Sequence, residues 1–108
     1  MANKYSYKFL PIADKDLDNT LSYIEQELHN PKAAEDLASE IFNKIDVACN
    51  NPEAFAKVNN EFIKDKTLRR FTAGNYVVFY KPNQDTQVII IMRIIYGGMD
   101  IDKILKSM

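Results

Sequence analysis

Apolar residues change their spacing along the chain, and each spacing predicts a different element. Tyr5, Tyr7 and Phe9 alternate with polar residues, and this period of two is typical of a half-buried strand. Pro11 ends that strand. From Ile12 to about Glu27, apolar residues recur every three or four positions, which predicts a helix with one apolar face. The residues on that face are Leu17, Leu21, Ile24 and Leu28.

A second helix is predicted after Asn30 and Pro31, because Asn caps free helix amides and Pro is tolerated at the first helical position. Its apolar spacing continues to Ala48, and Pro52 ends it. The short join between the two helices makes them antiparallel neighbours. We expect the acids Asp14, Asp16 and Asp18 to lie in the first turn of the first helix, where the helix dipole favours anions. The two helices thus form a helical hairpin, and we expect its outer face to be acidic.

The second half of the chain predicts three strands and a short helix. Residues 51–66 show no period, and we expect Phe55 and Phe62 to hold this irregular connection against the core. The extended runs are Thr67 to Phe71, Tyr76 to Tyr80 and Gln87 to Ile95, separated by turn residues at 73–75 and 82–85. The last run is apolar on both faces except at Arg93, as expected for a central strand.

After Gly97 and Gly98, Asp100 is placed to cap a final helix that carries Ile101, Ile104 and Leu105. The order of elements predicts an α+β fold: an N-terminal strand, an antiparallel helical hairpin packed on a small, mainly antiparallel sheet, and a short C-terminal helix. Residues 1–108 fit a single domain. The second face of the sheet is only partly covered, which leaves a surface for a partner or substrate.

Composition narrows the function classes. The chain is 46% hydrophobic and 27% charged, ordinary globular proportions. A lone cysteine, Cys49, and a polar N-terminus without a signal peptide favour the reducing cytoplasm, and no apolar run is long enough for a membrane helix. His29 stands without a second ligand, so we expect no metal site. Because no phosphate-binding or dinucleotide motif occurs, no cofactor is expected either.

Charge is divided unevenly between the two parts of the chain. The overall net charge is −1, but residues 1–66 carry −4 and residues 67–108 carry +3. All three arginines, Arg69, Arg70 and Arg93, lie in the second part. A cation on an apolar strand such as Arg93 must find a partner or reach an opening. For Arg93, a structural or antitoxin-facing ion pair and a contact with a target both satisfy that requirement, whereas Arg69 and Arg70 could instead pair with the acidic hairpin or face solvent.

Several segments, taken in order, resemble the RelE/ParE family of toxins from bacterial type II toxin–antitoxin systems. They include the opening strand and the Asn30-Pro31 helix start. In the sheet they are Leu68-Arg69-Arg70-Phe71, Gly74-Asn75-Tyr76-Val77 and Arg93-Ile94-Ile95-Tyr96-Gly97-Gly98-Met99-Asp100. The resemblance implies a toxin held inactive by a cognate antitoxin, in a complex that is hetero-oligomeric.

The family contains two activities, gyrase poisoning by the ParE branch and cleavage of messenger RNA on the ribosome. Many ribonuclease members resemble Gly-Asp-Tyr-Arg in the third strand, with the Arg serving the phosphate, whereas this chain has Val77 after Tyr76. The family's His and second Arg at the end of the last strand are replaced here by Tyr96 and Met99. We therefore favour the gyrase-binding branch, with DNA gyrase as the target.

Four residues are the predicted contacts with a target or antitoxin: Arg69, Arg70, Arg93 and Tyr96. The alternative function is a ribosome-dependent endoribonuclease. In that case Arg69 or Arg70 and Arg93 would hold the phosphate, and Tyr96 would transfer protons, giving the candidate catalytic set Arg70, Arg93 and Tyr96. Strict alternation along a strand sends Arg93 and Tyr96 to opposite faces, so they converge only if the strand bulges or ends at Ile95.

Overall fold

A computed structural model describes residues 4–58, 66–99 and 101–106, and the elements follow the predicted order. They are β1 (Ser6–Phe9), α1 (Pro11–Ser22), η1 (Tyr23–Glu27), α2 (Pro31–Asn50), β2 (Arg69–Ala73), β3 (Tyr76–Asn83), β4 (Val88–Tyr96) and α3 (Ile101–Lys106). The expected anchor Phe62 and the expected cap Asp100 lie outside the described residues.

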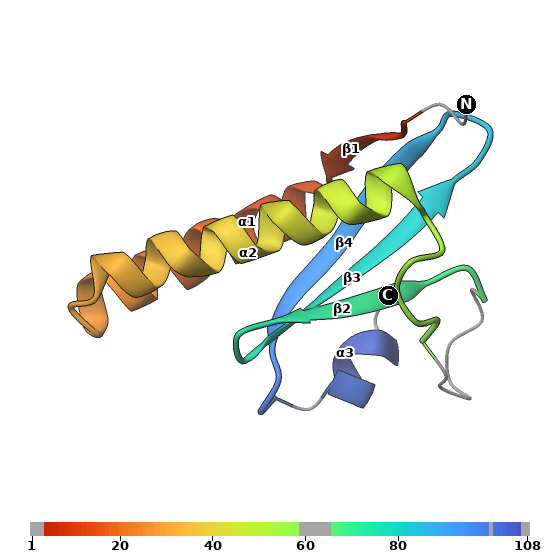
Figure 1. Ribbon diagram of the computed structural model, residues 1–108. Helices are drawn as coiled ribbons and strands as arrows, with labels where there is room; N and C mark the ends of the chain where they lie inside the picture. Colours follow the sequence, from red (N-terminus) through yellow and green to blue (C-terminus); the bar gives the residue numbers. More distant parts are fainter. Residues whose placement is uncertain (1–3, 59–65, 100, 107–108) are drawn as a thin grey trace.

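The four strands form one mixed sheet in the order β1-β4-β3-β2. β4 lies between β1 and β3, which confirms it as a central strand. It runs parallel to β1 and antiparallel to β3, and β3 runs antiparallel to β2. The hairpin of α1 and α2 crosses one face of this sheet, and its tip projects beyond the strands, whereas α3 lies against the opposite face (Figure 1).

The hairpin begins and turns where the sequence predicts, but its tip is wound differently. The side chain of Asn30 accepts a hydrogen bond from the Ala33 amide at 3.1 Å, which confirms the helix cap. Before it, η1 is a turn of π-helix in place of the regular helix expected to Glu27. The additional residue in this wider turn rotates Leu28 off the apolar face, and Leu28 is exposed, which corrects its assignment to that face.

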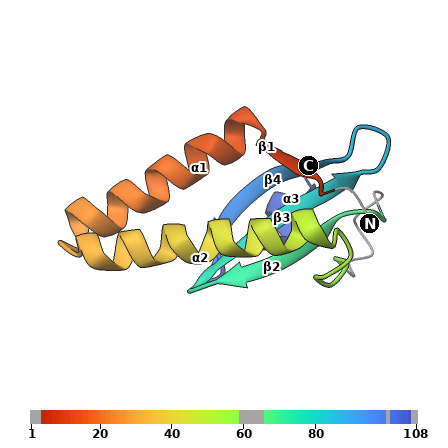
Figure 2. The same cartoon turned by 45° about the horizontal axis from the view of Figure 1, so that its top comes forward.

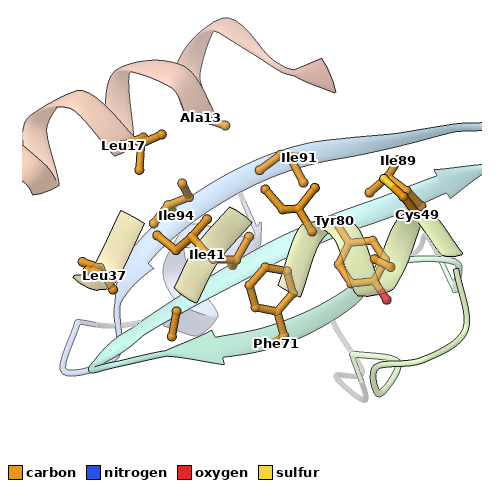
Figure 3. Close-up of a cluster of buried hydrophobic side chains, with 14 of the residues drawn as sticks. Ala13, Leu17, Leu37, Ile41, Cys49, Phe71, Tyr80, Ile89, Ile91 and Ile94 are labelled. Atoms are coloured by element: carbon orange, nitrogen blue, oxygen red, sulfur yellow. The ribbon is translucent and has the colours of Figure 1, made fainter. Parts of the chain in front are cut away.

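The helical hairpin lies over one face of the sheet (Figure 2), and a large core of buried side chains fills the space between them (Figure 3). Ile41 of α2 is fully buried there against the strands, and Cys49 is buried at the end of the same helix. The strand residues of this core are Phe71, Ala73, Val78, Tyr80, Ile89, Ile91 and Ile94. A smaller cluster under α3 lies on the other face and contains Leu68, Val77, Phe79, Ile95 and Leu105.

The strand ends differ from the predicted ones by several residues. β2 starts at Arg69 and not at Thr67, and β3 runs on through Pro82 to Asn83 before the turn. Pairing between β2 and β3 stops at Tyr80, so beyond that residue β3 has a strand on one side only. Proline is tolerated in such a position because no second ladder requires its missing N–H.

Phe55 confirms its expected role as an anchor of the irregular connection. Its ring lies 5.0 Å from the ring of Phe71 and 6.3 Å from that of Tyr80, measured between centroids. The residues that follow it pair with the edge of β2, where the Arg70 amide donates to the Ala56 carbonyl at 3.1 Å. The start of the β2 edge is thereby covered.

The buried Tyr80 should make the stability of the fold sensitive to high pH. Its ring is fully buried, its hydroxyl donates to the Pro52 carbonyl at 3.1 Å, and burial raises the pKa of the phenol above its ordinary value. The unfolded chain therefore releases this proton near pH 10, while the folded chain still holds it. The contribution of Tyr80 to the free energy of unfolding is fully present below pH 10 and is lost as pH rises further.

We expect Tyr80→Phe to lower the free energy of unfolding at neutral pH by about 1–2 kcal/mol, because the partly buried Pro52 carbonyl loses its donor. The same change should also make the loss of stability above pH 10 less steep. Urea denaturation at several pH values measures both effects. An unchanged slope above pH 10 would show that Tyr80 is not the group responsible.

Candidate functional site

Arg93 of β4 is held by Asp16 of α1. The guanidinium donates to both oxygens of the carboxylate, from Nε at 2.8 Å and from a terminal nitrogen at 3.1 Å. The two side chains are only 21% and 16% exposed. The hydrogen bond to Asp16 raises the pKa of Arg93 above its ordinary value. This bidentate geometry is the strong form of an arginine–carboxylate pair.

The fold explains why Asp16 reaches this strand. Pairing between β1 and β4 ends at Ile91, and the chain turns at once into α1 beside the remainder of β4. Asp16 then accepts a hydrogen bond from the Ile94 amide at 3.0 Å, so its carboxylate takes the place of a neighbouring strand. A bulge precedes the site, because Met92 has no partner between Ile91 and Arg93 in the register with β3.

This placement corrects the interpretation of the three acids in α1. Of the acids expected in the first turn, only Asp14 lies there. Asp16 lies two residues beyond Asp14, in the second turn of the helix, and it binds Arg93 and the Ile94 amide. No sequence signal near Asp16 identifies its partner, since the two residues are 77 positions apart.

Tyr96 ends β4 and is 48% exposed. Its ring packs edge-on against Tyr76 of β3, with centroids 5.6 Å apart. A Cβ atom added to Gly98 would lie 2.6 Å from the Tyr96 ring, so a glycine at this position leaves room for the ring. Burial, and then the nearby hydroxyls of Tyr23 and Tyr96, raise the pKa of Tyr76. Tyr23, Tyr76 and Tyr96 thus form a tyrosine cluster, of which sequence reasoning identified only the last member.

Arg69 and Arg70 project from β2 to opposite faces, as alternation predicts. Arg69 shares the hairpin face with Phe71, and its guanidinium donates to the Phe55 carbonyl at 2.7 Å. Arg70 is exposed on the other face and has no ion-pair partner among the described residues. Arg70 is therefore the most accessible of the three arginines.

The structure does not bring the alternative catalytic set together. Arg70 of β2 and Arg93 of β4 both pair with Phe79 and therefore share a face of the sheet, but β3 separates their two strands. Tyr96 pairs with Tyr76, whose ring packs with the hairpin core, so Tyr96 is on the face opposite to Phe79. The bulge lies before Arg93 and does not change the alternation between Arg93 and Tyr96.

Grouped metal-ligand side chains and helices able to span a membrane are both absent from the described part of the chain. Within residues 4–58, 66–99 and 101–106, no three His, Cys, Asp or Glu side chains are grouped as metal ligands. No helix in these ranges combines the length and apolar character needed to cross a bilayer.

Comparison with solved structures shows the same fold in several toxin–antitoxin proteins. A chain of the chromosomal ParDE system of P. aeruginosa matches with a TM-score of 0.67 at 18% identity, over 88% of this chain and 98% of that one. A chain of the RelBE2 toxin–antitoxin complex of Mycobacterium tuberculosis matches with 0.61 at 15% identity, over 87% and 99%. A chain of the archaeal RelE–RelB complex of Pyrococcus horikoshii OT3 matches with 0.59 at 24% identity, over 89% and 98%.

Comparison with curated proteins finds no match. The family model described as the ParE toxin of type II toxin–antitoxin system, parDE, matches residues 7–101. These residues include all four strands apart from Ser6, the first residue of β1. The chain therefore belongs to the ParE toxin family of type II toxin–antitoxin systems.

Proposed function

We propose that this ParE-family toxin arrests growth by binding DNA gyrase without cutting RNA, and that a cognate antitoxin holds it inactive. The observation that carries this proposal is the bidentate pair between Arg93 and Asp16. Cleavage of RNA requires cations that are free to stabilise charge on the scissile phosphate. In this chain the charge of the last-strand arginine is already neutralised by a carboxylate of the same molecule.

Recruiting Arg93 to a phosphate would be costly. The guanidinium would have to leave Asp16, whose mostly buried carboxylate would then keep, among the described residues, the Ile94 amide as its hydrogen-bond partner. Removing one member of a buried ion pair typically costs about 3–5 kcal/mol. The pair therefore favours a structural role for Arg93 and opposes a catalytic one.

Two further positions support the same choice. Val77, which stands where many ribonuclease relatives carry a phosphate-binding arginine, is buried in the cluster under α3 and has no charge to offer. Tyr96 lies on the face of the sheet away from Arg70. A phosphate held at Arg70 would have no proton donor from this tyrosine on its own side of the sheet.

Among the predicted contact residues, Arg70 and Tyr96 are the exposed ones, and we assign them to partner binding. The guanidinium groups of Arg69 and Arg93 are already bound within the chain. Aromatic residues such as Tyr are enriched where proteins recognise one another. The complex with the antitoxin would be hetero-oligomeric and would form in the cytoplasm, where gyrase acts.

A supercoiling assay with purified DNA gyrase tests the proposal. We expect the chain to inhibit supercoiling and Tyr96→Ala to weaken this inhibition about tenfold, because an exposed aromatic anchor is removed. Tyr7→Ala is the matched control, since Tyr7 is also 48% exposed but lies at the other end of the sheet. Normal supercoiling in the presence of excess wild-type chain would refute gyrase as the target.

A further inference from the structure

The strands and the hairpin carry opposite charges. The four strands contain five cations and no acid; the cations are Lys8, Arg69, Arg70, Lys81 and Arg93. Residues 11–50, which form the hairpin, contain nine acids and three lysines. Because the hairpin covers only one face of the sheet, negative charge is concentrated on that side of the molecule and positive charge remains in the strands (Figure 1).

The strand register shows where these cations lie. Lys8 of β1, Ile90 of β4 and Lys81 of β3 form one row across the sheet. Lys81 and Phe79 are alternate residues of β3 and therefore share a face, and Phe79 belongs to the cluster under α3. The row of Lys8 and Lys81 is thus on the side of the sheet opposite to the hairpin.

Arg70 lies on the same side, because it pairs with Phe79 in the register. We define the cationic face by Lys8, Arg70 and Lys81, with the half-buried side chain of Ile90 between the two lysines. The half-buried side chain of Met92 follows Ile90 along β4 and packs against the cluster under α3. Lys8 and Arg70 are exposed. Arg93 adds little net charge here because Asp16 neutralises it.

We propose that the cationic face binds an acidic, extended segment of the antitoxin. The inference rests on the proposed function for the identity of the partner, but its charge chemistry comes from the strands themselves. A segment that alternates acidic and apolar residues would place carboxylates near Lys8 and Arg70 and its apolar side chains on Ile90 and Met92. The acidic hairpin repels such a segment from the opposite side, so the field of the molecule steers it to this face.

A polypeptide fits this face better than a nucleic acid does. Binding of nucleic acid depends on dense phosphate neutralisation and on exposed rings that stack with bases. The cationic face has three cations, and the ring of Phe79 within it is fully buried. The exposed rings of Tyr7, Phe42 and Tyr96 belong to the hairpin side, where the acids lie.

Fluorescence anisotropy with a short labelled peptide of alternating Glu and Leu tests the inference on the full chain. We expect Lys8→Glu and Arg70→Glu each to weaken peptide binding about tenfold, a loss typical of reversing one interfacial charge. Lys15→Glu on α1 is the control, because it makes the same change of net charge at an exposed position of the hairpin. It should change the affinity by less than about twofold. Circular dichroism checks that each variant folds.

Three results would overturn the inference: no binding of the peptide to the wild-type chain, an equal loss with Lys15→Glu, or tighter binding of a single-stranded RNA of similar length. Amide shifts in an NMR titration provide a second readout, and they should concentrate at β1 and the first half of β4. The gyrase assay separates this inference from the proposed function. Peptide binding without gyrase inhibition refutes only the target, and inhibition without peptide binding refutes only the cationic face.

Discussion

Replacing Asp16 by alanine will lower the free energy of unfolding by about 2–4 kcal/mol, one of the two largest single-residue effects that we expect in this chain. The change removes both acceptors of the Arg93 guanidinium and the acceptor of the Ile94 amide. It leaves a mostly buried cation without its counterion. The expected value is at the lower end of the range for buried pairs because both side chains retain some exposure. Urea denaturation measures the difference.

Two further variants identify the cause of that loss. Asp18→Ala removes an exposed acid from the same helix and should change the free energy of unfolding by less than about 0.5 kcal/mol. The double variant Asp16→Ala, Arg93→Met should be more stable than Asp16→Ala alone, because it no longer contains the unpaired cation. If the double variant is the less stable of the two, the pair is not the source of the effect.

Ile41→Ala will reduce stability by a similar or larger amount, about 2–5 kcal/mol, by leaving a cavity between α2 and the sheet. Ile41 is 0% exposed and faces the strand residues of the large core (Figure 3). A chain of this size has a free energy of unfolding of only about 5–15 kcal/mol, so the variant should unfold at a much lower urea concentration than the wild-type chain.

Val47→Ala provides the comparison for Ile41→Ala. Val47 lies on the same helix and is also β-branched, but it is exposed. Its truncation should cost less than about 0.5 kcal/mol, as at most surface positions. Equal losses for the two variants would contradict the assignment of the core to this face of α2.

The periodic segments were predictable because their apolar spacing directly reflects which side is buried. The stripe from Ala34 to Ala48 specifies α2 and its buried face without reference to distant residues. The alternation at residues 5–9 predicts β1, but Tyr7 on its aromatic side is 48% exposed, so the pattern does not give the extent of burial. Asn30 and Pro31 marked the start of α2 because capping depends on neighbouring residues alone. Local physics therefore accounts for the order of the elements and for the hairpin.

The remaining features depend on contacts between distant segments. The sequence predicts that Arg93 needs a partner, but only the position of α1 beside the unpaired edge of β4 selects Asp16 over the other acids. The extension of β3 through Pro82 follows from where β2 stops pairing, which no local pattern reveals. The tyrosine cluster likewise unites three elements, and no local pattern shows that Tyr23 and Tyr76 lie close to Tyr96.

The most direct test of the non-nucleolytic function is a map of RNA 3′ ends after the purified chain is added to translating ribosomes. We expect no new ends at the ribosomal A site, because Arg93 is bound to Asp16 and Tyr96 is on the other face from Arg70. Cleavage at A-site codons that disappears in Arg70→Ala or Tyr96→Phe would contradict this expectation and would show that the chain acts as a ribonuclease.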